Sequence, residues 1–322
     1  MSEHAETREA PRRARWRFGL ACAIAAALGL VLACWPAVVK VSPRSHWLAQ
    51  AMASRLFVTC AVVLVAGGLL LALLAAFLWQ AGRPYRKARR GESGVAILEF
   101  ALAMPFLLII GLVMAQASLL MVGNVCVHYA AFCAARSAIV VIPREFGSGE
   151  PRNLLVDSDA DTGKMYRIKL AAVTALAPVS CGSDEISGAG AGGDTYVEGI
   201  DRFLSLQSVE RPGWVDERLS RKLAYAGEYT DVEVDPPLPR TDPDEAEEDG
   251  LFDDNEDVHV TVRHTFYMSV PTGAWIFSFF AERVELPFGT NEYGMKMAAY
   301  YTLPNEGVQD YVDIEEFPRD AR

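Results

Sequence analysis

Three long apolar segments dominate the first half of the chain, and they lie at Phe18–Val39, Leu56–Trp79 and Val95–Val122. Each is close to or above the roughly 20 residues that a helix needs to cross a bilayer. The helical pattern of the third segment continues to Ile142, where Pro143 ends it. A helix over Val95–Ile142 is about 72 Å long. That length is about twice what a bilayer requires, so we expect its second half to project outward and pack on other elements.

Beyond Pro143 the apolar segments become short and polar linkers separate them. The pattern predicts two helices and three strands: Lys164–Ala177, Trp214–Tyr225, Thr230–Val234, Val258–Phe266 and Gly294–Tyr301. The segment 236–257 is acidic, contains prolines and has little apolar content, which indicates an exposed loop. An aromatic group at Trp275, Phe277, Phe279 and Phe280 is typical of a core, with a membrane-facing patch as the alternative.

The two halves of the chain have opposite charge. Residues 1–144 carry 15 Lys/Arg against 5 Asp/Glu, whereas residues 145–322 carry 15 against 36. Basic residues cluster before the first apolar segment and between the second and third. The positive-inside rule then places the N-terminus and the basic loop 80–94 in the cytoplasm and the acidic part outside. An acidic domain of this size argues against nucleic acid as a partner, because phosphates would repel it.

The expected fold is therefore a membrane α region joined to an α+β domain outside the membrane. Residues 1–94 form a two-span hairpin with a basic cytoplasmic loop, and 95–142 form a long helix that spans and projects. Residues 143–322 form the acidic domain with a small antiparallel sheet. The first segment also has the basic and apolar parts of a signal peptide, but Leu32 stands where a lipoprotein cleavage box needs a small residue, so we interpret it as a span.

Residues with catalytic or metal-binding chemistry are sparse. The chain has no nucleophile elbow, phosphate loop, HExxH or CxxC motif, so we expect no enzyme activity, no metal and no cofactor. Asp157–Gly163 alternates carboxylates as a calcium loop does, but Thr162 and Ile168 replace the glycine and glutamate of that template, which favours a polar loop with Asp161 or Thr162 capping the next helix. His259 and His264 are five apart on a predicted strand and should point to opposite faces.

The remaining polar and thiol side chains mostly have a packing interpretation. His128 stands alone on the long helix and is expected to be packed. Five of the six cysteines lie in or beside apolar helices, and only Cys181 lies in the acidic domain, so that domain has no internal disulfide. Cys126 and Cys133 share a helix face; we interpret them as buried thiols, with a pair between subunits as the alternative.

One carboxylate, Glu99, lies near the start of the third apolar segment. An acid in such a segment is costly and usually has a partner or a task, although a carboxylate one turn into the span can also reach the interface. Gly94 precedes it by five residues, after the basic run that begins at Arg89. This spacing resembles a type IV prepilin. The resemblance implies cleavage between Gly94 and Val95 by a prepilin peptidase, and pairing of Glu99 with the new amine of a neighbouring subunit.

More of this region resembles the TadE-like family, the minor pseudopilins of tight-adherence (Flp) pilus systems. The similarity lies in Glu99-Phe100-Ala101 followed by Pro105, in Ala134-Ala135-Arg136, and more loosely in residues 258–303. It implies an inner-membrane, structural role in pilus assembly, adhesion or secretion, with other pilin-like subunits as partners. Pro105 should kink the helix. Small residues at Gly111, Ala115 and Ser118 form a face on which helices could pack.

The chain also departs from this family. Two predicted spans and 93 residues precede Gly94, where prepilin leaders are short, and the second arginine that follows the family's A-A-R is absent. The alternative interpretation is an uncleaved, membrane-anchored outer domain that acts as an adaptor or sensor.

Overall fold

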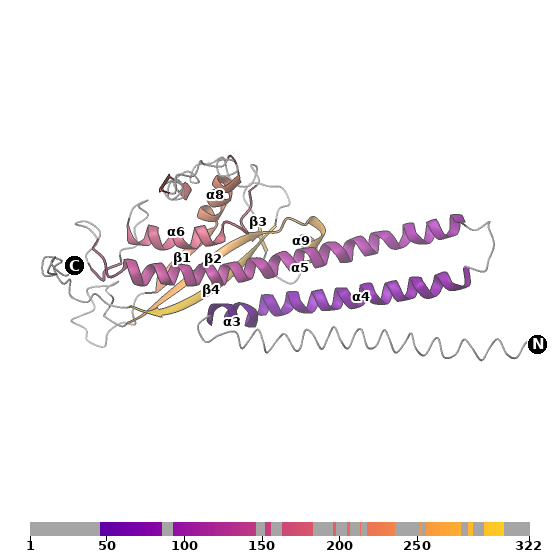
Figure 1. Ribbon diagram of the computed structural model, residues 1–322, viewed down its shortest axis with the longest axis horizontal. Helices are drawn as coiled ribbons and strands as arrows, with labels where there is room; N and C mark the ends of the chain where they lie inside the picture. Colours follow the sequence, from indigo (N-terminus) through magenta and orange to yellow (C-terminus); the bar gives the residue numbers. More distant parts are fainter. Residues whose placement is uncertain are drawn as a thin grey trace, which may run out of the picture.

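The computed structural model describes residues 46–85, 93–145, 152–155, 163–182, 196–197, 205–206, 213, 218–235, 252, 256–277, 283–285 and 293–305. The predicted first span at Phe18–Val39 and the carboxylates of the possible calcium loop lie outside this part of the chain. The described elements form an elongated molecule (Figure 1). Two long helices run side by side at one end, and at the other end shorter helices and a sheet surround one of them.

The first described elements are α3 (His46–Ala53) and α4 (Arg55–Tyr85), separated by Ser54. The Ser54 hydroxyl accepts a hydrogen bond from the backbone N–H of Phe57 at 3.3 Å and donates one to the carbonyl of Ala51 at 2.7 Å. Serine is a favoured N-cap because its side chain satisfies an N–H that has no partner within the helix. One residue thus ends α3 and begins α4, which contains the second predicted span.

Helix α5 (Ser93–Val141) has 49 residues and contains Pro105 without interruption. The prediction of a helix from Val95 to Ile142 is confirmed within two residues at its start and one at its end. Within the described chain, two stretches are long and apolar enough to cross a membrane, Arg55–Leu74 and Ala101–Val141. They pack along each other as an α4–α5 hairpin.

The contact face of α5 toward α4 has the spacing of a coiled-coil seam. Among the partly or fully buried positions of α5, one set follows steps of four and three: Ala103, Leu107, Ile110, Met114, Ala117, Met121 and Asn124. Gly67 of α4 lies at the middle of this seam, where an added Cβ would be 2.9 Å from Met114 and 3.8 Å from Ile110. A seam of this period keeps two nearly antiparallel helices in contact over many turns.

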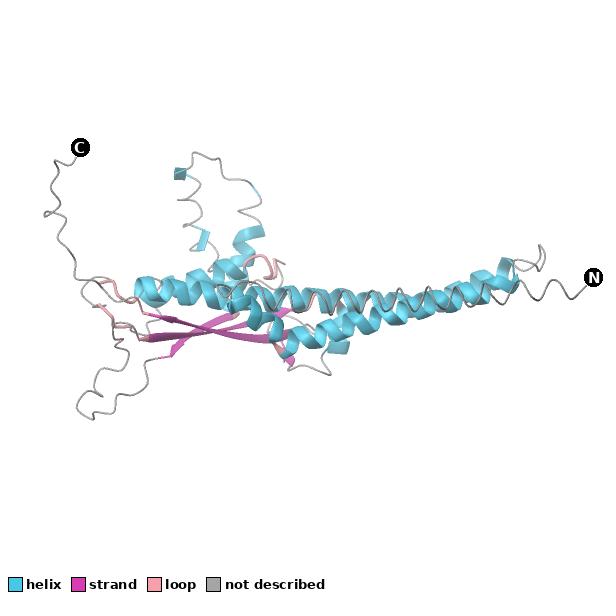
Figure 2. Cartoon of the chain, turned by 60° about the horizontal axis from the view of Figure 1, so that its bottom comes forward, coloured by secondary structure: helices cyan, strands magenta, loops and turns pink. Residues whose placement is uncertain are grey.

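Four strands form one antiparallel sheet in the order β1-β2-β4-β3. They are β1 (Thr230–Asp235), β2 (Asp257–Tyr267), β3 (Arg283–Glu285) and β4 (Tyr293–Pro304), and β3 is much the shortest. Burial alternates along β2, so that every second residue from Val258 to Phe266 is buried. The buried face packs on the second half of α5, and Figure 2 shows the sheet lying along that half only. The three predicted strands are confirmed.

Two further helices cover α5 beside the sheet. Helix α6 (Lys164–Leu176) packs along α5, and α8 (Ser220–Glu228) packs on α6. Close approach is possible because this part of α5 is rich in small buried residues: Ala130, Ala131, Ala134, Ala135 and Ala138 are all fully buried. The alanines of the A-A-R sequence therefore have a packing role, while Arg136 is exposed.

The helix expected at Trp214–Tyr225 is confirmed in its second half as α8, which runs from Ser220 to Glu228 and so ends three residues later than expected; residues 214–217 lie outside the described residues. Two other local predictions were wrong. The loop expected over 236–257 includes Phe252, which is 2% exposed and donates its N–H to the carbonyl of Asn153 at 2.8 Å. Its last residue, Asp257, begins β2. The N-cap of α6 is Gly163 at φ 134°, not Asp161 or Thr162.

The segment after β2 forms a helix that the sequence pattern did not predict. Pro271–Phe277 is α9, which packs on the middle of α5. Proline at the first helical position has a suitable φ and lacks only an N–H that the helix does not use. Of the aromatic group expected in the core, Phe277 is 4% exposed, whereas Trp275 is 59% exposed. Phe279 and Phe280 lie outside the described residues.

Candidate functional site

The residues predicted for cleavage and register lie at the start of α5. Gly94 and Val95 are in its first turn, and Glu99 and Phe100 are in its second. The side chains of these residues lie outside the described part of the structure. The peptide bond between Gly94 and Val95 is therefore helical in this state, so a peptidase that binds extended chain would have to unwind one turn.

The residues predicted for helix packing, Gly111, Ala115 and Ser118, are all exposed and point away from the seam with α4. A Cβ added at Gly111 would meet no atom within 4 Å. The Ser118 hydroxyl donates to the carbonyl of Met114 in its own helix at 2.9 Å. The α4–α5 contact therefore does not use this small-residue face.

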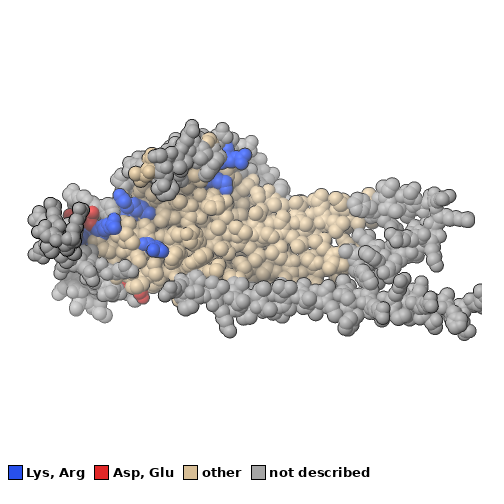
Figure 3. All heavy atoms as spheres, viewed as in Figure 1, with Lys and Arg blue, Asp and Glu red and all other residues tan. Residues whose placement is uncertain are grey.

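Large apolar side chains flank that face and continue onto α4. They form an exposed surface that we name the hairpin surface, which includes Leu102, Phe106, Leu108, Leu119, Val122, Val62, Leu70 and Leu73, each between 40% and 74% exposed. The described surface of the hairpin carries no charged group in the view of Figure 3, whereas Lys, Arg, Asp and Glu gather on the sheet-bearing end. Soluble proteins rarely expose so many large apolar side chains together.

Three other residues of α5 mark the level where the hairpin joins the sheet-bearing domain. Gln116, Gly123 and Asn124 are buried, and each contacts a different part of the chain. We name these residues the junction. The rest of the described helix from Leu112 to Val127 is apolar, except for exposed Ser118 and half-buried Cys126.

At Asn124 the junction holds the break between α3 and α4. The side-chain amide of Asn124 donates to the carbonyl of Ala51 at 3.0 Å and to the Ser54 hydroxyl at 2.9 Å. Both groups belong to helix ends, where backbone and capping atoms need partners. Asn124 thus fixes the point at which α4 begins.

At Gly123 the junction holds the sheet. A Cβ at this position would be 2.7 Å from the ring of Phe266 and 3.4 Å from Met297. Phe266 is on β2 and Met297 on β4, and both are nearly fully buried. The absence of a side chain at Gly123 therefore lets two strands rest directly on α5.

At Gln116 the junction holds α9. The fully buried Gln116 side chain accepts a hydrogen bond from the N–H of Val270 at 3.1 Å. A Cβ added to Gly273 would lie 2.5 Å from the Gln116 Cβ and 3.2 Å from the carbonyl oxygen of Leu112. The glycine and the glutamine together place α9 in direct contact with the α5 backbone.

Beyond the junction, an aromatic cluster ties α3 to α5 and the sheet. Trp47 packs on Tyr129 and Phe132 with ring centroids 5.2 Å and 6.4 Å apart, and Phe132 meets the edge of Tyr301 at 5.2 Å. Further along, the ammonium of fully buried Lys164 donates to the carbonyls of Ile142 and Leu154 at 2.9 Å and 2.8 Å. It satisfies a carbonyl just past the end of α5, where a cation is favourable.

The sheet places its two histidines on opposite faces, as predicted. His259 is exposed and shares a hydrogen bond of 2.7 Å with the Thr302 hydroxyl. His264 is 1% exposed, and its Nδ1 lies 2.9 Å from the Thr230 hydroxyl. Burial lowers the pKa of His264 to about 4, against a smaller opposing effect from the Tyr229 backbone. His128 is buried, as predicted.

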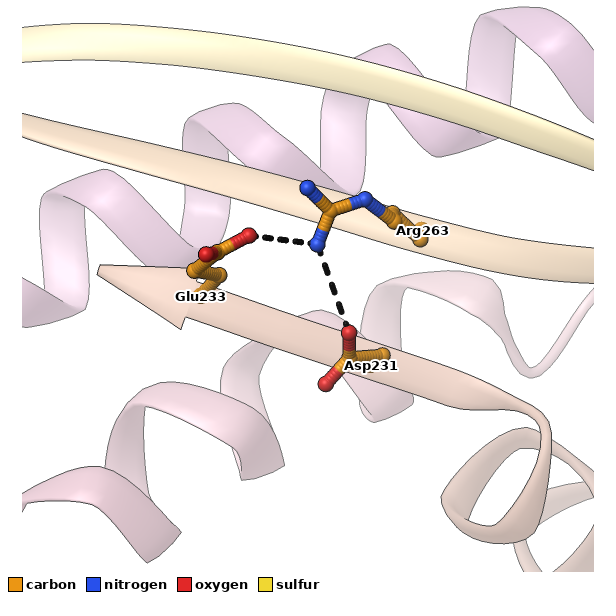
Figure 4. A network of polar contacts seen from close by, with 3 residues as sticks. All are labelled: Asp231, Glu233 and Arg263. Atoms are coloured by element: carbon orange, nitrogen blue, oxygen red, sulfur yellow. Dashed lines mark hydrogen bonds and ion pairs between the residues drawn. The ribbon is translucent and has the colours of Figure 1, made fainter. Parts of the chain in front are cut away.

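The outer face of the sheet carries a charged group, shown in Figure 4. One guanidinium nitrogen of Arg263 on β2 contacts a carboxylate oxygen of Glu233 and, at 3.4 Å, one of Asp231, both on β1. The hydrogen bond with Glu233 is the main reason that the pKa of Arg263 is raised. All three side chains are at least half exposed, so this group holds neighbouring strands but encloses no site.

Cavities and metal ligands give no catalytic arrangement in the described part of the chain. Among those residues, no three His, Cys, Asp or Glu side chains lie together as a metal site. The larger of two shallow pockets, about 350 Å³, is lined mainly by apolar groups such as Leu119, Val122 and Phe266, with Ser269 and Lys222 at its edge. Lys222 donates to the carbonyls of Ala177 and Pro178 at 3.4 Å and 2.9 Å, at the end of α6.

Sequence reasoning found the small-residue face but missed the junction. Gln116, Gly123 and Asn124 lack a recognisable motif, although two amides in an apolar helix are a signal that they have partners. Comparison of the chain with protein-family models, curated proteins and solved structures finds no match in any of the three.

Proposed function

We propose that this protein is a structural, pseudopilin-like component of a tight-adherence pilus assembly or secretion apparatus, located in the bacterial inner membrane. The observation that carries the proposal is the division of α5. Its first half exposes an apolar surface with small residues that no other described element covers, and its second half is the buried spine of a sheet-bearing domain. Pilin-like subunits associate through a helix of this kind.

In this role the α4–α5 hairpin crosses the membrane and the sheet-bearing domain lies outside. Other pilin-like subunits pack on the face formed by Gly111, Ala115 and Ser118, because small residues allow helix backbones to approach closely. Glu99 sets the register by pairing with a partner cation near the cytoplasmic end, and Pro105 shapes the same stretch of helix. The hypothesis requires that the exposed face, and not the seam with α4, is the contact between subunits.

Photo-crosslinking from single positions on α5 tests this assembly. A photoreactive residue at Ala115 should yield products between subunits in native membranes, whereas one at Met114, which faces Gly67 of α4, should react only within the chain. The two positions are adjacent in sequence and lie at nearly the same depth in the membrane, so the comparison tests only which face of α5 contacts another subunit. Equal products between subunits from both, or none from Ala115, would contradict the proposal.

The second candidate is an uncleaved membrane anchor with an adaptor or sensor role. The packing of the N-terminal region favours it, because Ala51 and Cys60 are fully buried and Trp47 joins the aromatic cluster with α5. Cleavage after Gly94 would leave these helices bound without a covalent link. The N-terminal sequence and mass of protein from native membranes, beside a Gly94→Ala variant, separate the two candidates. A chain beginning at Val95 only in the parent supports the prepilin role, and an intact chain in both supports the anchor.

A further inference from the structure

We propose that α9 lies in the outer lipid–water interface and that Trp275 inserts into the lipid headgroup region there. The partner is thus a lipid surface, and the inference rests on the membrane insertion of the α4–α5 hairpin proposed above but on neither cleavage nor assembly. It assigns a role to an element that the sequence pattern did not reveal.

The first argument is the position of α9 along α5. Its contacts are with Leu112 and Gln116, which lie 17 and 21 residues beyond Val95. At 1.5 Å per residue these contacts are about 26 to 32 Å from Val95. The hydrocarbon core of a bilayer is about 30 Å thick. If the apolar part of α5 starts at the inner boundary, α9 is therefore at the outer boundary.

The second argument is the direction of its side chains. Gly273, Ala274 and Phe277 are buried toward the body of the protein, while Trp275 is 59% exposed beside them. Pro271–Phe277 contains no charged residue. Tryptophan is enriched at membrane interfaces because its ring is apolar and its N–H can remain hydrated. An exposed tryptophan on an uncharged helix at this level has the chemistry of an interfacial anchor.

The third argument is how rigidly the backbone of this segment is held. Backbone N–H and C=O groups outside a helix need hydrogen-bond partners within the protein when they lie at the level of the membrane. The N–H of Val270, just before α9, has the Gln116 side chain as its acceptor, and the N–H of Ala274 bonds the carbonyl of Val270 at 2.7 Å. The segment can thus enter an apolar environment without leaving these donors unsatisfied.

The exposed apolar surface is also continuous at this level. Leu119 and Val122 of α5 are 40% and 54% exposed and, with Ser269 just before α9, line the shallow apolar pocket. Lipid contacts on the hairpin surface can therefore extend to α9. The one charged group that lines this pocket is Lys222, whose ammonium is held by the carbonyls of Ala177 and Pro178.

Depth-dependent quenching of tryptophan fluorescence by brominated lipids tests the inference on the full-length protein in vesicles. The signal of Trp275 is the difference between the parent chain and Trp275→Phe, a change at an exposed side chain. We expect most of this signal to be lost with lipids brominated near the headgroup and much less to be lost with lipids brominated near the bilayer centre. Aqueous iodide should have little effect.

Trp47 supplies a matched control. It packs on Tyr129, which lies 13 residues beyond Gln116 and hence about 20 Å farther from the membrane. The difference signal of Trp47→Phe should therefore be insensitive to brominated lipids at every depth.

Three results would overturn the inference. Stronger quenching from the bilayer centre would place α9 within the hydrocarbon, with the outer boundary nearer Arg55. Quenching by iodide alone would place Trp275 in water, and protection from both quenchers would indicate a protein partner. Trp79 of α4 shows whether the protein has inserted into the membrane. If lipid quenches Trp79 but not Trp275, the hairpin is in the membrane and only the inference on α9 is wrong.

Discussion

The two halves of α5 share one continuous backbone and a similar apolar composition, but they differ in what covers them. From Ala101 to Ala115 the helix exposes large side chains such as Leu102 and Phe106, at 74% and 64%. From Gln116 to Val141, α3, α6, α9 and the sheet cover most of the helix, which buries amides as well as alanines, and only single large side chains such as Leu119 and Val122 stay exposed. Hydrophobicity alone therefore does not distinguish a helix face that needs lipid or a partner from one that the chain itself buries.

The halves should also respond differently to their surroundings. Stability of the sheet-bearing end depends on close packing and on buried polar groups with partners, which substitutions and pH can disturb. The first half of α5 has few such groups among its described residues, so its integrity should depend on lipid and on neighbouring subunits. Changes at matched positions in the two halves test this difference.

The largest change in stability should occur when the pH is lowered, and it should affect the sheet-bearing end. The folded pKa of His264 is about 4, below the ordinary 6.5, so the unfolded chain takes up the proton first. The stabilisation is complete above pH 6.5 and is lost as pH falls from there toward 4. The difference corresponds to about 3 kcal/mol. Unfolding followed by the near-ultraviolet signal of the sheet-bearing domain, at a series of pH values, measures it.

The exposed histidine on the other face gives the control. His259→Leu should retain the pH dependence. His264→Leu should lose only about half of the part that falls between pH 6.5 and 4, because burial also lowers the pKa of His128 to about 4. If both variants kept the same pH dependence as the parent chain, buried His264 would not be its source.

Replacing glycine by alanine should change stability in opposite directions in the two halves of α5. Gly123→Ala adds a Cβ 2.7 Å from the buried ring of Phe266, and overpacking of this kind costs about 1–3 kcal/mol. At Gly111 an added Cβ meets none of the described residues within 4 Å, so Gly111→Ala should gain up to about 1 kcal/mol from helix propensity. Thermal unfolding of the purified variants in the same detergent gives both values. A loss of equal size at both positions would mean that the first half is as closely packed as the second.

A loss of stability of similar size is expected where the junction holds α3. Asn124→Ala removes two hydrogen bonds and leaves the carbonyl of Ala51 and the Ser54 hydroxyl without this partner, at a cost of about 1–3 kcal/mol. The emission of Trp47 should shift to longer wavelength as α3 loosens from α5. Ser118→Ala, which loses only a bond within its own helix, should leave both stability and emission unchanged.

Sequence pattern predicted the elements whose period or composition is set locally. The clean alternation of Val258–Phe266 and the uncharged stretch of α5 each favour one backbone conformation along their length, so β2 and α5 were predicted within two residues. The small-residue face of Gly111, Ala115 and Ser118 was also found, and it is exposed; its contact with other subunits stays a prediction.

The junction and α9 could not be predicted in this way because their causes are not local. Gln116 and Val270, which share a hydrogen bond, are 154 residues apart, and Asn124 and Ser54 are 70 apart. Pro271 and Gly273 suggest a turn when viewed alone, and only contact with α5 shows that the proline starts a helix and the glycine allows it to approach. Gly163 at the start of α6 likewise replaces a side-chain cap, with φ at 134°.

The smallest effect on stability should come from the charged group on the outer face of the sheet. Arg263→Ala removes the contacts with Glu233 and Asp231, but water and salt already screen these exposed charges. The unfolding midpoint should therefore not change measurably, whereas amide exchange in β1, an edge strand, should become faster because two like charges then lie on it unopposed. A clear fall in the midpoint would show that the sheet depends on its outer face as well as on α5, and the contrast between covered and exposed surfaces would then not account for its stability.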